Sequence, residues 1–176
     1  MFAMFVVLLF TSLGSRPATQ SSGPAKAAEL APVSWIAGTW IGHQGDAAPG
    51  GVDVRMDVRW TPNAQALAMD LTTIHDATSQ PLMSALYYWH PGTRAITMWQ
   101  ILSNGTVNDG RVVTASDAGL TQELRATDPN GKTRLLRTEF VREGPDQFQF
   151  ISSARASADD PWVAGAPIRF SRQPNK

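Results

Sequence analysis

The most regular feature of the chain is a strict alternation of apolar and charged residues from Val52 to Trp60. Apolar side chains occupy every second position, so one face of this segment is apolar and the other is charged. This period of two predicts a β-strand with one buried and one solvated face. The charged face carries both signs, and its members are expected to pair across strands: Asp53, Arg55, Asp57 and Arg59.

Short apolar runs continue along the rest of the chain, and turn-forming residues close each of them. Asn104-Gly105 is the strongest hairpin signal. No clear helical run of ten or more residues interrupts the series, although residues 30–37 predict one or two helical turns. The pattern predicts an all-β antiparallel up-and-down barrel of about 9–10 strands with a short N-terminal helix. The later runs cover residues 67–74, 82–89, 96–102, 107–114, 120–126, 134–142, 148–154 and 168–172.

An almost unbroken apolar run also occupies residues 2–13, ahead of the predicted strands. It is shorter than the ~20 residues of a membrane-spanning helix, and it matches the apolar region of a secretory signal peptide, although no Lys or Arg precedes it. Ala25-Lys26-Ala27 fits the cleavage pattern. We expect residues 1–27 to be a signal peptide and leader, and residues 28–176 a periplasmic or secreted domain without stable membrane insertion after cleavage. An uncleaved anchor or a loose cytoplasmic tail is the alternative.

Composition narrows the class of protein further. The 176 residues include 15 basic and 15 acidic side chains, and the pI is about 6.8. A nucleic-acid partner is therefore not expected, because such proteins carry a basic surface. The chain has no Cys, which excludes disulfides, zinc–thiolate sites and cysteine nucleophiles.

The segment Gly38-Thr39-Trp40, directly after the predicted helix, resembles the opening of lipocalin-like (calycin) barrels, which carry a G-x-W motif in the first strand. The resemblance implies that Trp40 points inward and plugs the closed end of the barrel. It also implies that a basic residue of the last strand, Arg169 or Arg172, packs over the indole as a cation–π partner.

Residues 35–45 (WIAGTWIGHQG) are also similar to the start of nitrobindin-type haem-binding barrels and of bacterial families of unknown function. A second stretch, from Tyr87 to Thr106, is similar to their middle hairpins. Nitrobindin-type barrels hold haem iron with a His late in the chain, whereas the last His here is His90. Met98 and Tyr88 are the other side chains able to ligate iron. No cofactor is expected.

Six Trp residues are many for this length, and barrels of this size can enclose one small ligand. The leading function is therefore non-catalytic binding of a small apolar or amphipathic molecule inside the barrel. A packed core is the competing interpretation of the same aromatic residues. The candidate ligand-binding residues are Trp40, Met56, Trp60, Met69, Tyr88 and Trp99.

Two other functions remain open. An isomerase or hydrolase would need a carboxylate or His inside the barrel, and Asp70 lies within an apolar run. Glu139 lies within another. For both carboxylates the competing interpretation is an ion pair with a neighbouring arginine, such as Arg137 for Glu139. A structural or protein-interaction module would instead show a solid core and an exposed apolar patch, for which Trp162 in a loop is the candidate.

The three His residues carry no motif for catalysis or metal binding. Alternation from Trp40 places His43 on the outer face of its strand. His75 and Asp76 are adjacent at a strand end, where neighbouring side chains point to opposite faces and cannot orient each other. His90 precedes Pro91-Gly92 and is expected in a turn. We expect no metal site.

Overall fold

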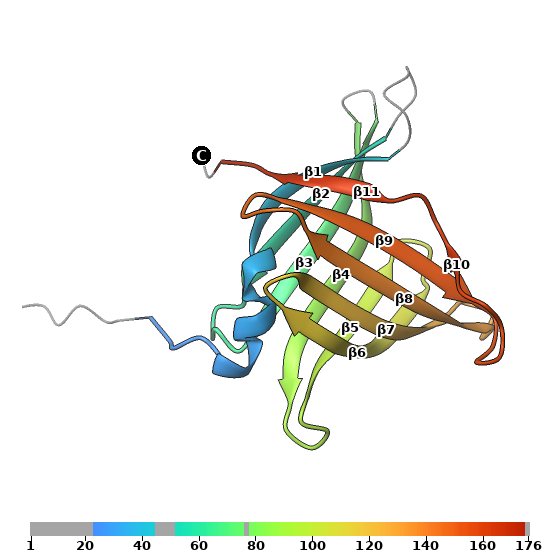
Figure 1. Cartoon of the computed structure of the whole chain (residues 1–176), viewed down its shortest axis with the longest axis horizontal. Coiled ribbons are helices and arrows are strands. Elements are labelled where there is room, and N and C mark those ends of the chain that lie inside the picture. The colour runs from blue at the N-terminus through green and yellow to red at the C-terminus, as the bar shows by residue number, and fades with distance from the viewer. Residues whose placement is uncertain (1–22, 45–51, 76–77, 175–176) are drawn as a thin grey trace, which may run out of the picture.

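The computed structural model describes residues 23–44, 52–75 and 78–174, in which the chain forms the all-β antiparallel up-and-down barrel that the sequence predicts (Figure 1). A 3-10 helix, η1 (Ala28–Ile36), precedes it. Of the eleven strands, β10 has only two residues and the other ten close the barrel. The strands are β1 (Gly38–Gln44), β2 (Val52–Trp60), β3 (Ala66–His75), β4 (Thr78–His90), β5 (Ala95–Leu102), β6 (Val107–Ser116), β7 (Gly119–Thr127), β8 (Thr133–Arg142), β9 (Gln147–Arg155), β10 (Val163–Ala164) and β11 (Ile168–Arg172).

The apolar run of residues 2–13, on which the predicted signal peptide rests, lies outside the described residues. Within the described ranges, no helix is long and apolar enough to cross a membrane.

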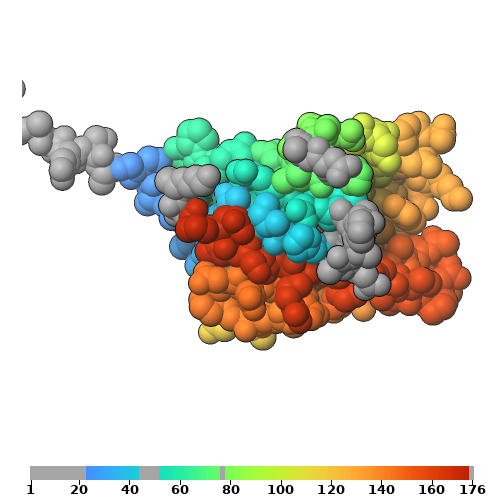
Figure 2. Space-filling model, turned by 90° about the horizontal axis from the view of Figure 1, so that it is seen from above, coloured from blue at the N-terminus to red at the C-terminus, as the bar shows by residue number. Residues whose placement is uncertain are grey.

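The last strand closes the barrel. Each strand from β1 to β8 pairs with the next strand along the chain. Between β9 and β1 lies β11, which pairs with both of them. Figure 2 shows β11 in red against β1, with β9 in orange on its other side. Closure pairs the backbone of both edge strands, which would otherwise be free to join another chain.

The alternation along β2 has the two faces that the sequence predicts. Val54, Met56 and Val58 are buried in the core, whereas the charged residues point outward and form ion pairs. Arg55 pairs with Asp57 at 2.7 Å on the same strand, and other pairs link β2 to its neighbours. Outer charges thus neutralise one another along the wall, while the apolar face fills the interior.

One end of the barrel is solid, and we call it the closed end: η1, Trp35, Trp40, Phe148 and Arg172. Leu30, Val33 and Ile36 of η1 are fully buried over the strand ends. The Trp40 indole is also fully buried, donates a hydrogen bond to the Ile36 carbonyl at 2.8 Å and packs edge-on to Phe148 with centroids 4.9 Å apart. The inward, plugging position of Trp40 is confirmed.

Arg172 is the basic residue that covers Trp40. Its guanidinium carbon lies 4.0 Å from the centroid of the indole, and its nitrogens donate to the carbonyls of Ala37 at 2.7 Å and Trp35 at 3.0 Å. Gly38 makes this approach possible, because a Cβ there would collide with the Arg172 guanidinium and the backbone has φ +134°. Any larger residue at the glycine position of the G-x-W motif would therefore clash with the covering arginine.

Candidate functional site

Away from η1 the barrel interior is hollow. A cavity of about 360 Å³ lies there, a size within the ~300–1,000 Å³ range of ligand pockets. It reaches strand ends remote from η1, namely the end of β5 and the starts of β8 and β11. Most of its wall is apolar, with contributions from Val54, Met56, Met69, Leu71, Leu82, Met83, Leu102, Leu124, Leu136, Phe140, Phe150, Ile168 and Phe170.

Polar side chains form one side of this wall, on the inner faces of β5 to β9. Gln122 pairs with Thr138 across β7 and β8, and Thr138 pairs with Ser152 across β8 and β9. Gln100 and Asn108 are partners across β5 and β6. All but the half-buried Ser152 are at most 6 % exposed. Burying a polar group costs free energy unless the group forms a hydrogen bond, so the hydrogen-bond partners of these side chains determine the cost of the polar wall.

Two hydrogen-bonded groups account for part of this polar wall. The Tyr87 hydroxyl donates to Gln122 Oε1 at 2.9 Å. Burial raises the Tyr87 pKa far above its ordinary value, so the hydroxyl stays protonated as a donor. On the neighbouring strands, Asn108 Nδ2 donates to Gln100 Oε1 at 2.7 Å, and Gln100 Nε2 donates to the Met98 sulfur at 3.4 Å.

Two polar atoms of the cavity wall have no hydrogen-bond partner in the protein: Asn108 Oδ1 and Thr138 Oγ1. The residues are only 4 % and 5 % exposed, and both line the cavity. Leaving such a group unpaired in the interior costs about 1–3 kcal/mol. A molecule that enters the cavity and bonds to these atoms would recover that free energy, so they are natural contact points.

The six predicted ligand-binding residues fall into three places. Met56 and Met69 line the cavity. Trp40 and Trp60 point inward but lie toward η1, where Trp40 is packed into the closed end and Trp60 is half-buried with the Lys26 ammonium 5.3 Å from its centroid. The structure thus brings only the two methionines of this set to the cavity wall.

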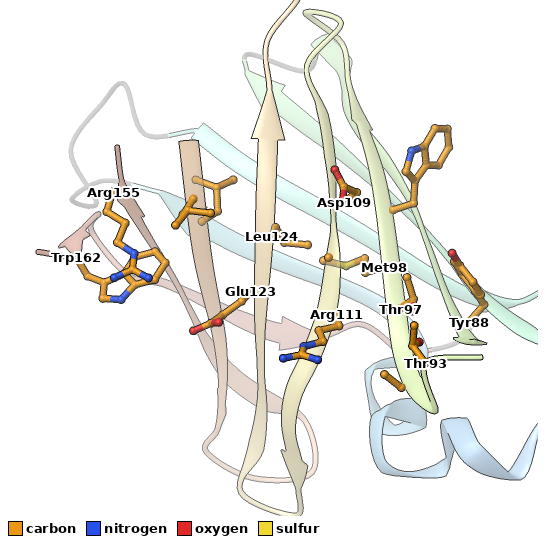
Figure 3. A pocket seen from close by; sticks show the side chains of 15 residues that line it. Tyr88, Thr93, Thr97, Met98, Asp109, Arg111, Glu123, Leu124, Arg155 and Trp162 are labelled. Atoms are coloured by element: carbon orange, nitrogen blue, oxygen red, sulfur yellow. The ribbon is translucent and has the colours of Figure 1, made fainter. Parts of the chain in front are cut away.

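Tyr88 and Trp99 require a correction, because both lie on the outer face of the barrel. Their neighbours Tyr87 and Met98 are fully buried inside, while Trp99 is 44 % exposed. Both outer side chains line a groove of about 550 Å³ that crosses the outside of β5 to β8. Figure 3 shows Tyr88 at one end of this groove and Trp162 at the other.

The loop around Trp162 does not form the free aromatic patch considered for an interaction module. The guanidinium carbons of Arg137 and Arg155 lie 4.5 Å and 4.4 Å from its ring centroid, and the side chain is half-buried. The neighbouring Val163 is exposed at 69 %. Cation–π contacts with two strands hold the indole against the barrel wall.

Asp70, the carboxylate considered for the alternative catalytic function, is on the outer face of β3. It accepts hydrogen bonds from Arg59 at 2.6 Å and Ser84 at 2.7 Å. The Arg59 bond, followed by the Ser84 bond, holds the pKa of Asp70 below its ordinary value. Such a carboxylate is ionised and cannot serve as the buried general acid, whereas pairing with a neighbouring arginine, the competing interpretation, is confirmed.

Glu139 and the His residues also lie outside the cavity. Arg137 pairs with Glu123 at 2.6 Å, so the predicted pairing of Arg137 with Glu139 is wrong. His43 points outward and pairs with Asp53, as its alternation predicts. His90 accepts a hydrogen bond from the Thr93 amide at 3.1 Å within its turn. His75 is exposed at the end of β3.

The described residues supply no group of side chains suited to a metal or to haem. In these ranges, which omit Asp76, no group of three or more His, Cys, Asp or Glu side chains is arranged to hold a metal. The two other residues able to ligate haem iron do not fit that role either. The Met98 sulfur already accepts a hydrogen bond from Gln100, and Tyr88 lies on the outer face.

Sequence reasoning missed the polar residues of the cavity, although the pattern contains a signal for two of them. Gln122 shares its alternating face with Leu120 and Leu124, and Thr138 stands between Leu136 and Phe140. A polar residue in register with an apolar face is unusual, because burial needs a partner. These two positions could have been selected as interior polar sites.

Comparisons with known proteins concern the fold. The structure is similar to the crystal structure of Rv2717c from M. tuberculosis, with a TM-score of 0.58 and 16 % sequence identity over 85 % of this chain and 100 % of that chain. The barrel is therefore calycin-like in fold. No protein-family profile matches the sequence, and no curated protein matches it either.

Proposed function

We propose that this protein binds one small apolar or amphipathic molecule in the cavity of its barrel. The observation that supports the proposal is the cavity of about 360 Å³, whose wall contains two deeply buried polar atoms without partners. A packed core would instead fill this volume, since protein interiors are close-packed. Both the open volume and the unpaired atoms favour binding over a purely structural role.

The route of the ligand follows from the contrast between the ends. At the closed end, η1 and Trp40 fill the barrel, so entry is expected from the far end. There the exposed side chain of Arg134 contributes to the cavity wall, to which Leu102 and Ile168 also belong. An amphipathic ligand would then keep a solvated group near Arg134 and bury its apolar body.

A fluorescence titration with N-phenyl-1-naphthylamine, a neutral dye that brightens in apolar surroundings, tests the proposal. Ser152→Phe adds a ring to the inner face of β9 at the cavity. Val141→Phe adds a ring to the outer face of β8, where Val141 is 45 % exposed. We expect saturable dye binding that weakens at least about tenfold in the first variant, because an occupied pocket loses its contacts, and not in the second.

Absence of saturable binding by the wild-type protein would overturn the proposal. Equal weakening in both variants would place the dye outside the cavity and count against it as well. Native mass spectrometry of the purified protein, compared with its denatured mass, adds a second readout. A retained small molecule would support binding and reveal the chemical class of the natural ligand.

We also propose that binding takes place after export, since residues 2–13 match the apolar region of a signal peptide. The test is expression of the full chain in an exporting bacterium, followed by fractionation and N-terminal sequencing. A periplasmic or secreted protein that begins at Ala28 is expected. A cytoplasmic protein with residue 1 retained would contradict export without affecting the proposed binding.

A further inference from the structure

The polar atoms of the cavity also indicate which ligands it favours. We propose that the cavity selects neutral molecules that carry a hydrogen-bond donor, an O–H or N–H, on a compact apolar body. This inference rests on the proposed function and deepens it. Its basis is a directional series of hydrogen bonds that leaves the carbonyl oxygen of Asn108, a residue of the cavity wall, as an acceptor without a partner in the protein.

The series begins at Met98, whose sulfur is fully buried. A thioether can accept a hydrogen bond but cannot donate one. The Gln100 side chain must therefore turn its NH₂ group toward that sulfur, at 3.4 Å. Its carbonyl oxygen is then directed away from Met98 and toward β6, where Asn108 lies opposite Gln100 in the strand register.

Asn108 is oriented in turn by Gln100. Its NH₂ group donates to Gln100 Oε1 at 2.7 Å, and the reverse orientation would bring two carbonyl oxygens together at that distance. Asn108 Oδ1 is consequently the atom left over, and it has no partner in the protein. One sulfur thus fixes two amides, and the unpartnered Asn108 Oδ1 can only accept a hydrogen bond.

Thr138 does not discriminate in the same way. Its Oγ1 is buried and unpartnered as well, but a hydroxyl can rotate to donate or accept. A ligand with either kind of polar group can satisfy it. Asn108 is selective because a ligand without a donor leaves its oxygen desolvated and unpaired, which sites built to bond an O–H penalise strongly.

The apolar lining favours a ligand whose remaining part is apolar and uncharged. The cavity wall contains four methionine and leucine side chains from β3 and β4 alone, and phenylalanines from β8, β9 and β11. Among the described lining residues the one cation is Arg134, which is exposed at the rim. A carboxylate placed deep in the cavity would meet the acceptor oxygen of Asn108 without a compensating charge, which disfavours buried anions.

A pair of isomers tests the selectivity directly. Octanol and heptyl methyl ether contain the same atoms, but only octanol carries an O–H donor. Isothermal titration calorimetry on the wild-type protein is expected to show octanol binding about tenfold more tightly, the effect of one buried hydrogen bond gained or lost. N-phenyl-1-naphthylamine titrations on the same samples report whether the cavity binds at all.

Three variants locate the preference. Asn108→Leu removes the acceptor and keeps the size, so octanol should weaken until the two isomers bind within about twofold. Thr138→Val, the matched control at the other unpartnered atom, should keep the octanol preference. Gln100→Leu frees the Asn108 amide to rotate and offer its NH₂ group, so the ether should gain affinity. Circular dichroism and dye binding establish that each variant is folded.

The outcomes separate this inference from the proposed function. Equal binding of the two isomers to the wild type, or an octanol preference that survives Asn108→Leu, overturns the donor selectivity and leaves ligand binding intact. Dye binding without octanol binding also overturns the selectivity. If neither the dye nor either isomer binds, the proposed function fails together with the inference. If Asn108→Leu does not fold, the binding of octanol and the ether to Gln100→Leu tests the selectivity instead. A gain of affinity for the ether supports the selectivity, and no gain overturns it.

Discussion

The two halves of the barrel interior are built from the same ten strands but are packed differently, since one is filled and the other contains a cavity. At the closed end, Trp40, Phe148 and η1 fill the space, and Trp40 and Arg172 both donate to backbone carbonyls. In the other half, which we call the cavity half, about 360 Å³ stays open and two polar atoms lack partners. The closed end also leaves one buried donor, Trp35 Nε1, without a partner, so the difference between the halves lies in packing: one is filled and the other keeps an open volume.

The largest expected effect is at the centre of the closed end. Trp40→Ala removes a fully buried indole and its hydrogen bond to Ile36. We expect the free energy of unfolding to fall by about 3–5 kcal/mol, measured by urea titration with circular dichroism. Trp40→Phe, which keeps a ring, should lose less. A loss below about 1 kcal/mol for Trp40→Ala would show that the closed end is not the main source of stability.

Arg172 gives the next largest effect and has a matched control on the same strand. Arg172→Met removes the cover of Trp40 and leaves the carbonyls of Ala37 and Trp35 without their donors. The expected loss is about 1–3 kcal/mol. Arg169→Met removes an exposed arginine that pairs with Glu143, so the change should stay within about 0.5 kcal/mol. Equal losses in thermal or urea unfolding would contradict the specific role of Arg172.

In the cavity half, removing a polar group should raise the free energy of unfolding instead of lowering it. Thr138→Val replaces a buried, unpartnered hydroxyl by a methyl of similar size. The free energy of unfolding should rise by up to about 1 kcal/mol. The same substitution at Thr39, whose hydroxyl donates to Asp57 at 2.7 Å, should lower it by about 0.5–1.5 kcal/mol. Urea titrations of both variants at neutral pH measure the difference in sign.

The smallest expected effect comes from the charged outer wall, which both halves share. Hydrogen bonds from Arg59 and then Ser84 lower the pKa of Asp70 in the folded protein. Its contribution to stability is therefore complete above about pH 4 and is lost as the pH falls through the lowered folded-state pKa. Asp70 is partly exposed, so the contribution should stay below about 1 kcal/mol. Comparing Asp70→Asn with wild type at pH 7 and pH 3 measures it, and a larger effect at pH 3 than at pH 7 would contradict the assignment.

The fold could be predicted because its signals are local. Alternation in Val52–Trp60 defines both faces of β2, and Asn104-Gly105 closes the β5–β6 hairpin, where Gly105 has φ +83°. The Gly38-Thr39-Trp40 motif anticipated the closed end, including a covering arginine from the last strand. The first two depend on residues adjacent in sequence, whereas the closed end and its covering arginine were implied by the resemblance to lipocalin-like barrels.

The candidate site could be predicted only in part, because facing is ambiguous where both faces of a strand are apolar. In β4, Tyr87, Tyr88 and Trp89 are consecutive aromatics, and alternation alone does not say which of them points inward. In β5 the interior position belongs to Gln100, at 6 % exposure, and the outer position to Trp99. Hydrophobicity assigns these two in the reverse order, since it favours burial of the larger apolar side chain.

By itself, then, the sequence determined the class of fold through its pattern of apolar residues, and its resemblance to lipocalin-like barrels predicted the closed end around Gly38 and Trp40. Only the tertiary structure decided that the other half is hollow, that Gln100 and Asn108 face inward, and that Trp99 faces out. The physical reason is that a cavity results from packing across strands distant in sequence. Whether a buried polar atom finds a partner depends on the side chains that closure places opposite it.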